Sequence, residues 1–218
     1  KGNERASTVV EKSTPTFCSI PRSWVLRRDV ESAIQGPLPS AWLSFHGIAN
    51  PNNERTFIST IVGPVAAGNS LPLLSFAQQV MPQDIACLCG NLNSFVLDYC
   101  SRLKISSRNF NFFVVKQLPV YGHLIYSEVC QWGIAPQTLR DWLLPRVLEL
   151  TYSAWDREPF ARNCGWSGPP FRWDEERRFL LRCELDAVFF HLYLPATPEG
   201  KWKRALVSEG AAHDESEE

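Results

Sequence analysis

The fold is decided by one stretch, which reads Asn91-Leu-Asn-Ser-Phe-Val-Leu-Asp-Tyr-Cys-Ser-Arg-Leu-Lys-Ile-Ser-Ser-Arg-Asn-Phe-Asn-Phe-Phe-Val-Val-Lys-Gln-Leu-Pro119. Its first part predicts the end of a long amphipathic helix that begins near Pro82, because apolar residues recur at three- and four-residue spacing up to Tyr99. A short turn follows, and then residues 111–115, whose aromatic and β-branched side chains predict a strand. The proline at position 119 ends that strand. The stretch therefore predicts a helix, a turn and a strand in succession.

Between the predicted helix and strand lies a turn that is rich in cations and in small hydrogen-bonding side chains, here called the basic turn. Its members are Arg102, Lys104, Ser106, Ser107, Arg108 and Asn109. Phosphate oxygens accept hydrogen bonds from such side chains, so the basic turn is suited to a nucleic-acid backbone. The alternative is an ordinary solvated helix end, where cations also interact favourably with the helix dipole. Asn109 and Asn111 either cap and order the turn or bind base edges, since Asn can pair with adenine through two hydrogen bonds.

The composition is that of a globular protein. The 218 residues are 44% hydrophobic and include 13 Phe and 8 Trp, which is enough for the core of one large or two small domains. No apolar run approaches the roughly 20 residues of a membrane-spanning helix, and no signal peptide is present, so no membrane partner is expected. The net charge is −1, but the acidic side chains concentrate at the end of the chain, and the remainder is slightly basic. The chain begins at Lys1 rather than Met, which is typical of a fragment or a processed product.

The seven cysteines are spaced irregularly, and no Cys-x-x-Cys pair occurs. We interpret them as reduced thiols of a cytoplasmic protein, several of them in the core. Only Cys87 and Cys89 are close in sequence, and a zinc site would need a second pair of ligands, for which His123 and Cys130 are the nearest candidates. The sequence therefore predicts no metal site.

Short strands are predicted on the N-terminal side of the long helix, and further helices on the C-terminal side of the stretch. The strand candidates are residues 24–26, 41–45, 56–62 and 71–76. Helices are predicted at 138–154, with a kink or break at Pro145, and from a cap at Asp174 to about Tyr193. We therefore expect an α+β fold, a small mixed β-sheet with a long helix, followed by a helical subdomain. The expected divisions are a tether at 1–21, an α+β domain at 22–121, a helical subdomain at 122–195 and a flexible acidic tail at 196–218.

Several segments between residues 22 and 195 carry a family resemblance. They are residues 49–60 (Ala-Asn-Pro-Asn-Asn-Glu-Arg-Thr-Phe-Ile-Ser-Thr), 65–74 (Val-Ala-Ala-Gly-Asn-Ser-Leu-Pro-Leu-Leu), the 91–119 stretch, and 169–178 (Pro-Pro-Phe-Arg-Trp-Asp-Glu-Glu-Arg-Arg) leading to 185–193 (Leu-Asp-Ala-Val-Phe-Phe-His-Leu-Tyr). In this order they resemble the C-terminal target-recognition region, a TaqI-like specificity domain, of adenine-specific DNA methyltransferases. The enzymes concerned belong to type IIG restriction-modification and BREX-like phage-defence systems of bacteria. The chain departs from the family at Ser106-Ser107, where relatives often have two glycines.

The resemblance implies sequence-specific binding of double-stranded DNA. In such enzymes an N-terminal domain binds S-adenosylmethionine and carries an Asn-Pro-Pro-Tyr-type motif for the flipped adenine, while the C-terminal region reads the target site. That motif does not occur in these 218 residues. We therefore expect no catalysis and no cofactor in this chain alone, with S-adenosylmethionine in the N-terminal methyltransferase domain and that domain as a partner. The DNA-binding residues that the resemblance implies are the six of the basic turn together with Asn53, Arg55, Thr56 and Lys116.

Motifs of other common catalytic classes are not found. The sequence has no glycine-rich phosphate loop, no His-Glu-x-x-His and no Gly-x-Ser-x-Gly. The alternative to DNA binding is therefore a protein–protein interaction or interdomain docking module of a defence complex. An exposed apolar patch around residues 155–173, which are rich in Trp, would favour this alternative.

Overall fold

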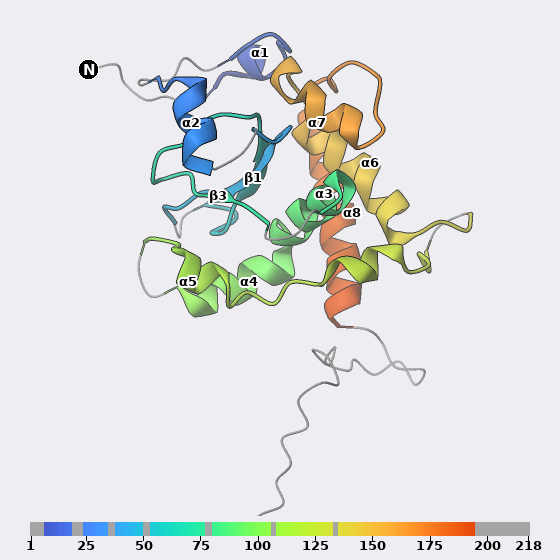
Figure 1. The fold of residues 1–218 in the computed structure, drawn as a ribbon. Helices are drawn as coiled ribbons and strands as arrows, with labels where there is room; N and C mark the ends of the chain where they lie inside the picture. Colours follow the sequence, from blue (N-terminus) through green and yellow to red (C-terminus); the bar gives the residue numbers. More distant parts are fainter. Residues whose placement is uncertain are drawn as a thin grey trace, which may run out of the picture.

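The structure is a computed structural model, and it has the expected α+β class, with a small sheet on one side and a group of helices on the other (Figure 1). It describes residues 7–18, 24–34, 38–49, 53–76, 80–105, 108–132 and 135–194. The expected acidic tail at 196–218 lies outside the described residues. Within the described residues, no helix is both long enough and apolar enough to cross a bilayer.

The sheet has three strands, in the order β2-β1-β3. The central strand β1 (Trp42–Phe45) pairs antiparallel with β2 (Ser59–Val62) and with β3 (Leu73–Leu74). The expectation of a mixed sheet was therefore wrong, because every pairing is antiparallel. Antiparallel neighbours need only short connections, whereas a parallel pair would need a crossover of a dozen or more residues.

The first strand candidate, residues 24–26, is not a strand. Trp24, Val25 and Leu26 are 80%, 58% and 57% exposed, and they precede the helix α2 (Arg27–Ile34). Apolar composition alone predicted the strand, but no described segment pairs with these residues. Part of the expected tether is also ordered, because α1 (Val9–Lys12) begins with a capping box between Thr8 and Glu11.

The long helix expected from Pro82 is two helices, α3 (Pro82–Leu92) and α4 (Phe95–Lys104). The break occurs because Asn93 turns its side chain to the sheet. Its Oδ1 accepts from the backbone N of Ser59 at 3.0 Å and its Nδ2 donates to the Ser59 carbonyl at 2.9 Å. The amide thus replaces a neighbouring strand beside β2. Ser94 then caps α4, with its hydroxyl accepting from the backbone N of Leu97.

The strand predicted at residues 111–115 is instead a one-turn helix, α5 (Phe112–Val115). Asn111 causes the change, because its side-chain oxygen accepts from the backbone N of Val114 at 3.0 Å and so caps a helix in place of a strand ladder. Only Phe110 enters the core, at 3% exposure, whereas Phe112 and Phe113 are 44% and 76% exposed. Of the two roles considered for Asn111, the structure therefore shows capping.

The C-terminal helices match the expectation more closely. They are η1 (His123–Ser127), α6 (Leu139–Thr151), η2 (Trp155–Arg157), α7 (Glu158–Asn163) and α8 (Glu175–Tyr193). Asp174 caps α8 as predicted, by accepting from the backbone N of Arg177 at 2.9 Å. The break predicted at Pro145 does not occur, because α6 continues through it as one helix. A capping box between Thr138 and Asp141 stabilises the first turn of α6, and the buried residues Leu143, Val147 and Leu148 pack the rest of the helix into the core.

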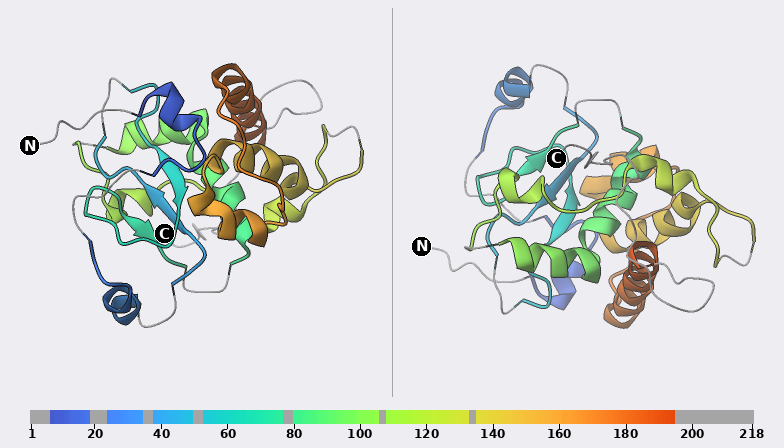
Figure 2. Two further views of the ribbon diagram at one scale, coloured as in Figure 1. Left: turned by 90° about the horizontal axis from the view of Figure 1, so that it is seen from above. Right: turned by 90° about the horizontal axis from the view of Figure 1, so that it is seen from below.

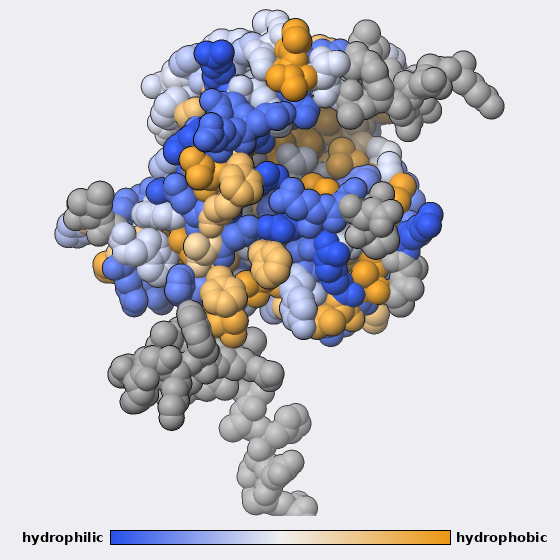
Figure 3. All heavy atoms as spheres, turned by 180° about the vertical axis from the view of Figure 1, so that it is seen from behind, coloured by the Kyte–Doolittle hydropathy of each residue, from blue (hydrophilic) through white to orange (hydrophobic). Residues whose placement is uncertain are grey.

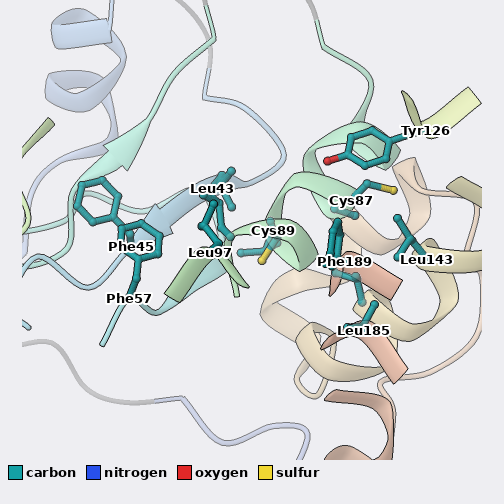
Figure 4. Close-up of a cluster of buried hydrophobic side chains, with 14 of the residues drawn as sticks. Leu43, Phe45, Phe57, Cys87, Cys89, Leu97, Tyr126, Leu143, Leu185 and Phe189 are labelled. Atoms are coloured by element: carbon teal, nitrogen blue, oxygen red, sulfur yellow. The ribbon is translucent and has the colours of Figure 1, made fainter. Parts of the chain in front are cut away.

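One hydrophobic cluster connects the two halves of the molecule (Figure 4). It runs from Phe45 and Phe57 beside the sheet, through Cys89 of α3, to Leu143 of α6. Helix α3 packs against β2, α6 and α8, so it lies between the sheet and the other helices. The core therefore continues across the boundary expected between residues 121 and 122. Helix α8 lies at the edge of the molecule in both views of Figure 2.

Candidate nucleic-acid interface

The residues predicted to bind DNA separate into two groups in the structure. One group, on residues 53–57 and α4, is joined by internal hydrogen bonds. The other is exposed to solvent and consists of Lys104 at the end of α4, Arg108 and Asn109 of the basic turn, and Lys116 at the end of α5. Ser106 and Ser107 lie outside the described residues.

The first group is organised by Asp98 of α4, which is 3% exposed. Its Oδ1 accepts from the backbone N of Thr56 at 2.6 Å and of Phe57 at 2.8 Å. Its Oδ2 accepts from Nε of Arg102 at 2.8 Å. A buried carboxylate is tolerated only when its oxygens are paired in this way. Asp98 thus fixes the chain at Thr56, whose own hydroxyl has no hydrogen-bond partner in the described structure.

Arg102 binds the same loop from its other edge. Its Nη2 donates to the carbonyls of Asn53 at 3.3 Å and Glu54 at 3.2 Å. Together with the bond to Asp98, these contacts occupy much of the guanidinium, and the side chain is 40% exposed. The structure therefore gives Arg102 an internal positioning role beside any contact with DNA.

Arg55 joins this loop to the last helix. It forms an ion pair with Asp186 of α8 at 2.5 Å and lies over the ring of Phe95. The other oxygen of Asp186 accepts from the backbone N of Phe95 at 2.6 Å. Burial raises the pKa of the Asp186 carboxyl, while the Phe95 amide and the Arg55 charge oppose that rise. Arg55 is therefore bound within the protein, and residues 53–57 are held by both α4 and α8.

Sequence reasoning missed the two carboxylates that arrange this first group. The spacing of Asp98 and Arg102, four residues apart on one helix, was a usable signal for that pair. The bond from Asp98 to Thr56 spans 42 positions in the chain, and no local pattern indicates it. The same is true of Asp186, which is 131 positions from Arg55.

The basic turn is attached to the sheet through backbone hydrogen bonds. Ala49 N donates to the Arg108 carbonyl at 2.5 Å, and Phe110 N donates to the Gly47 carbonyl at 2.9 Å, which makes an antiparallel bridge between Ile48 and Asn109. The chain is closely packed at Gly47, since a Cβ there would lie 3.3 Å from the Ser70 carbonyl oxygen. The backbone at Arg108, Asn109 and Phe110 is therefore fixed, while the side chains of Arg108 and Asn109 are exposed.

Three predicted cations belong to the exposed group: Lys104, Arg108 and Lys116. None of them forms an ion pair with another described residue. They lie on the end of α4, the turn and the end of α5, which are neighbours in Figures 1 and 2. A hollow of about 490 Å³ adjoins the turn, lined in part by Asn69, Asn109 and Asn111. This surface therefore presents three cations that have no counter-ion among the described residues.

The thiols of Cys87, Cys89 and Cys164 are buried in the core. Burial raises the pKa of the Cys89 and Cys164 thiols to about 12, and it raises that of Cys87 further. These thiols stay protonated at neutral pH. Within the described part of the chain, no three His, Cys, Asp or Glu side chains are grouped in a way that would hold a metal ion.

No family model, curated protein or solved structure matches this chain. The resemblance to the target-recognition regions of adenine methyltransferases therefore stays a prediction from the sequence.

Proposed function

We propose that this chain binds duplex DNA as the C-terminal specificity region of a site-specific N6-adenine DNA methyltransferase or restriction-modification enzyme. The observation that supports it is the set of three exposed cations, Lys104, Arg108 and Lys116, which have no counter-ion among the described residues; the backbone from Arg108 to Phe110 is hydrogen-bonded to residues 47–49 beside the sheet. A backbone that is already fixed favours phosphate binding because little backbone order has to be gained on association.

In this proposal the two groups of residues have different tasks. The exposed cations contact phosphates, and Asn109 supplies a polar contact beside them. Arg55 and Arg102 hold residues 53–57 in place through Asp186 and Asp98. Removing an exposed cation then affects affinity, whereas removing an internal arginine affects stability first.

Methyl transfer would be the task of the N-terminal catalytic domain, with S-adenosylmethionine bound there. A cavity of about 850 Å³ between the sheet and the C-terminal helices is not suited to the sulfonium of this cofactor. It is lined by Lys12, Arg55, Arg178 and Arg182 but only two acidic side chains, and S-adenosylmethionine carries a positive sulfonium. In this proposal the chain supplies DNA binding, and the N-terminal domain supplies the chemistry.

The direct test is duplex binding measured by fluorescence anisotropy over a range of salt concentrations. Each phosphate contact contributes about 0.9 to the slope of log K against log salt. The triple variant Lys104→Ala, Arg108→Ala, Lys116→Ala should therefore bind more weakly and with a slope smaller by about 2 to 3. The matched control is Arg172→Ala, an exposed cation on the connection between α7 and α8, which Figure 1 shows at the other end of the molecule from the labelled helices α4 and α5. Equal affinity and slope for the triple variant and the control would contradict the proposal.

A second candidate function, association of two copies through α8, is favoured by one specific feature. Exposed residues of α8 follow the order large, small, small, large along one face: Phe179, Cys183, Ala187 and Phe190. Figure 3 views the molecule from the α8 side and shows hydrophobic patches among hydrophilic residues. Monomeric surfaces rarely carry large contiguous apolar patches. In the segment 155–173, where an exposed patch would also favour an interaction role, Trp155 and Trp166 are 43% and 37% exposed.

The order of these residues fits an antiparallel pairing of two α8 helices. A two-fold axis near the middle of the helix would place Phe179 of one copy opposite Phe190 of the other. Cys183 and Ala187 would meet at the centre, where small side chains allow helices to approach closely. A self-complementary face is the arrangement that a symmetric dimer needs.

A further inference from the structure

A second site is formed by the cavity of about 850 Å³ between the sheet and the C-terminal helices. Its walls come from α1, residues 53–60, α3, α6 and α8. Its volume lies in the range of small-molecule sites, roughly 300 to 1,000 Å³. A DNA duplex is too wide to enter it, so its ligand would differ from the one proposed for the basic turn.

Apolar side chains line part of the cavity, together with polar ones such as Ser59, Thr60 and Asn93. The apolar part, here called the floor, consists of Ile58 next to β2, Val147 and Leu150 of α6, and Leu185 of α8. Gly90 of α3 lies among them, and a Cβ at this position would be 2.9 Å from Val147, so helices α3 and α6 approach closely here. The floor therefore suits an aliphatic or aromatic group.

The rim of the cavity has an excess of positive charge. Arg55 is neutralised by Asp186 at 2.5 Å, and Arg182 is only loosely paired with Glu54, at 3.5 Å with both side chains more than half exposed. Lys12 and Arg178 form no ion pair with any described carboxylate. Two positive charges are thus left without compensation.

These two cations are held in place on a single aromatic ring. Nζ of Lys12 lies 4.9 Å and Cζ of Arg178 lies 3.8 Å from the centroid of Trp173. Arg178 is fixed further, because it donates to the carbonyls of Glu149 and Leu150. Burial, and then the nearby charge of Arg182, lowers the pKa of Arg178. An anion at this rim would relieve the repulsion among the three cations.

We propose that this cavity binds a small amphipathic anion, with its apolar body on Ile58, Val147, Leu150 and Leu185 and its phosphate or carboxylate head on Lys12, Arg178 and Arg182. The ligand class follows from the two parts of the site. The apolar floor selects for a hydrocarbon or aromatic body, and the cations select for negative charge. The site is separate from the basic turn, so this inference does not depend on DNA binding.

The test is isothermal titration of the whole chain with three probes. Decyl phosphate, below its micelle concentration, should bind with 1:1 stoichiometry. Decyltrimethylammonium, with the same tail and opposite charge, should bind at least tenfold more weakly. Inorganic phosphate, which has the charge without the tail, should also bind at least tenfold more weakly. Similar affinities for the anionic and cationic detergents would overturn the proposal, because the cations would then contribute nothing.

Variants locate the binding on the cavity. Lys12→Gln and Arg182→Gln should each weaken decyl phosphate binding at least threefold, and Ile58→Trp, which fills the floor, at least tenfold. Arg172→Gln, an exposed cation outside the cavity, should leave it unchanged. Circular dichroism checks that each variant is folded. Unaltered binding by all three cavity variants would overturn the assignment, and so would displacement of decyl phosphate by a DNA duplex.

Discussion

Nε of Arg102 lies 2.8 Å from Oδ2 of Asp98, one helical turn earlier on α4. The other oxygen of Asp98 accepts two backbone N–H groups from the loop before β2. This pair therefore joins the helix, the loop and the sheet. It also explains why an arginine that a sequence pattern assigns to DNA has an internal partner.

The first prediction concerns Asp98. Asp98→Ala leaves two buried N–H groups and the Arg102 guanidinium without their acceptor, so the free energy of unfolding should fall by about 2 to 4 kcal/mol. Urea denaturation measures this change. Glu128→Ala, at an exposed position, should change it by less than about 0.5 kcal/mol. If Asp98→Ala lowered the free energy of unfolding by no more than Glu128→Ala does, the Asp98 carboxylate would not be what fixes the loop before β2.

The second prediction separates Arg102 from Lys104. Lys104→Ala should lower the salt slope of DNA binding by about 1 and leave the free energy of unfolding unchanged. Arg102→Ala should lower the free energy of unfolding, because it removes bonds to Asp98, Asn53 and Glu54. Urea denaturation and anisotropy titrations on the same preparations distinguish the two. If Lys104→Ala lowered the free energy of unfolding and Arg102→Ala changed only the salt slope, Arg102 would be the DNA contact and Lys104 the structural residue.

The third prediction is a pH dependence at the start of α6. Thr138 hydrogen bonds lower the pKa of the Asp141 carboxyl. A carboxyl with a folded pKa below its unfolded value stabilises the fold above the unfolded pKa, and this stabilisation is lost as the pH falls through the folded pKa. Thr138→Ala should thus cost about 1 kcal/mol at pH 7, and the cost should shrink below about pH 4.

Urea denaturation between pH 7 and pH 2.5 measures the cost of Thr138→Ala. The matched background is Asp141→Asn, which removes the titrating group at the same position. In that background the cost of Thr138→Ala should not vary with pH. With Asp141 present, Thr138→Ala should lower the free energy of unfolding less at pH 2.5 than at pH 7. A larger loss at pH 2.5 would contradict the conclusion that Thr138 lowers the pKa of Asp141.

The fourth prediction concerns the face of α8. Phe179→Glu and Phe190→Glu should each shift a self-association equilibrium towards the monomer, because each places a charge in an apolar interface. Sedimentation equilibrium measures the shift. Leu124→Glu, at a residue that is 74% exposed and lies on η1, is the control. Association that persists unaltered in both phenylalanine variants would exclude α8 as the contact.

Helices and strands whose ends are marked by capping or turn residues were predictable from the sequence. Helix α8 has a capping Asp174, and the cap and the helix that follows it agree with the structure. The spacing of its apolar residues did not indicate which face is buried, because Phe179, Leu180 and Phe190, expected to face inward, are exposed, whereas Leu181, Leu185, Val188 and Phe189 are buried. The central strand β1 was also found, because its short apolar run is bounded by turn residues. In these cases the local preference and the tertiary packing favour the same conformation.

Other elements were not predictable because single side chains decide them. The amide of Asn93 divides one expected helix by binding the edge of β2. The amide of Asn111 turns a β-like sequence into a helical turn. For the candidate site, sequence patterns named the cations but not their partners Asp98 and Asp186. Which cations face solvent depends on contacts between distant segments.

The measurement that tests the central claim most directly is selection from a pool of random-sequence DNA duplexes at low and moderate salt, with sequencing of the retained molecules. The account predicts salt-sensitive retention and enrichment of a short motif, with both lost in the triple variant of Lys104, Arg108 and Lys116. No retention of DNA by the unaltered chain at low salt would contradict it.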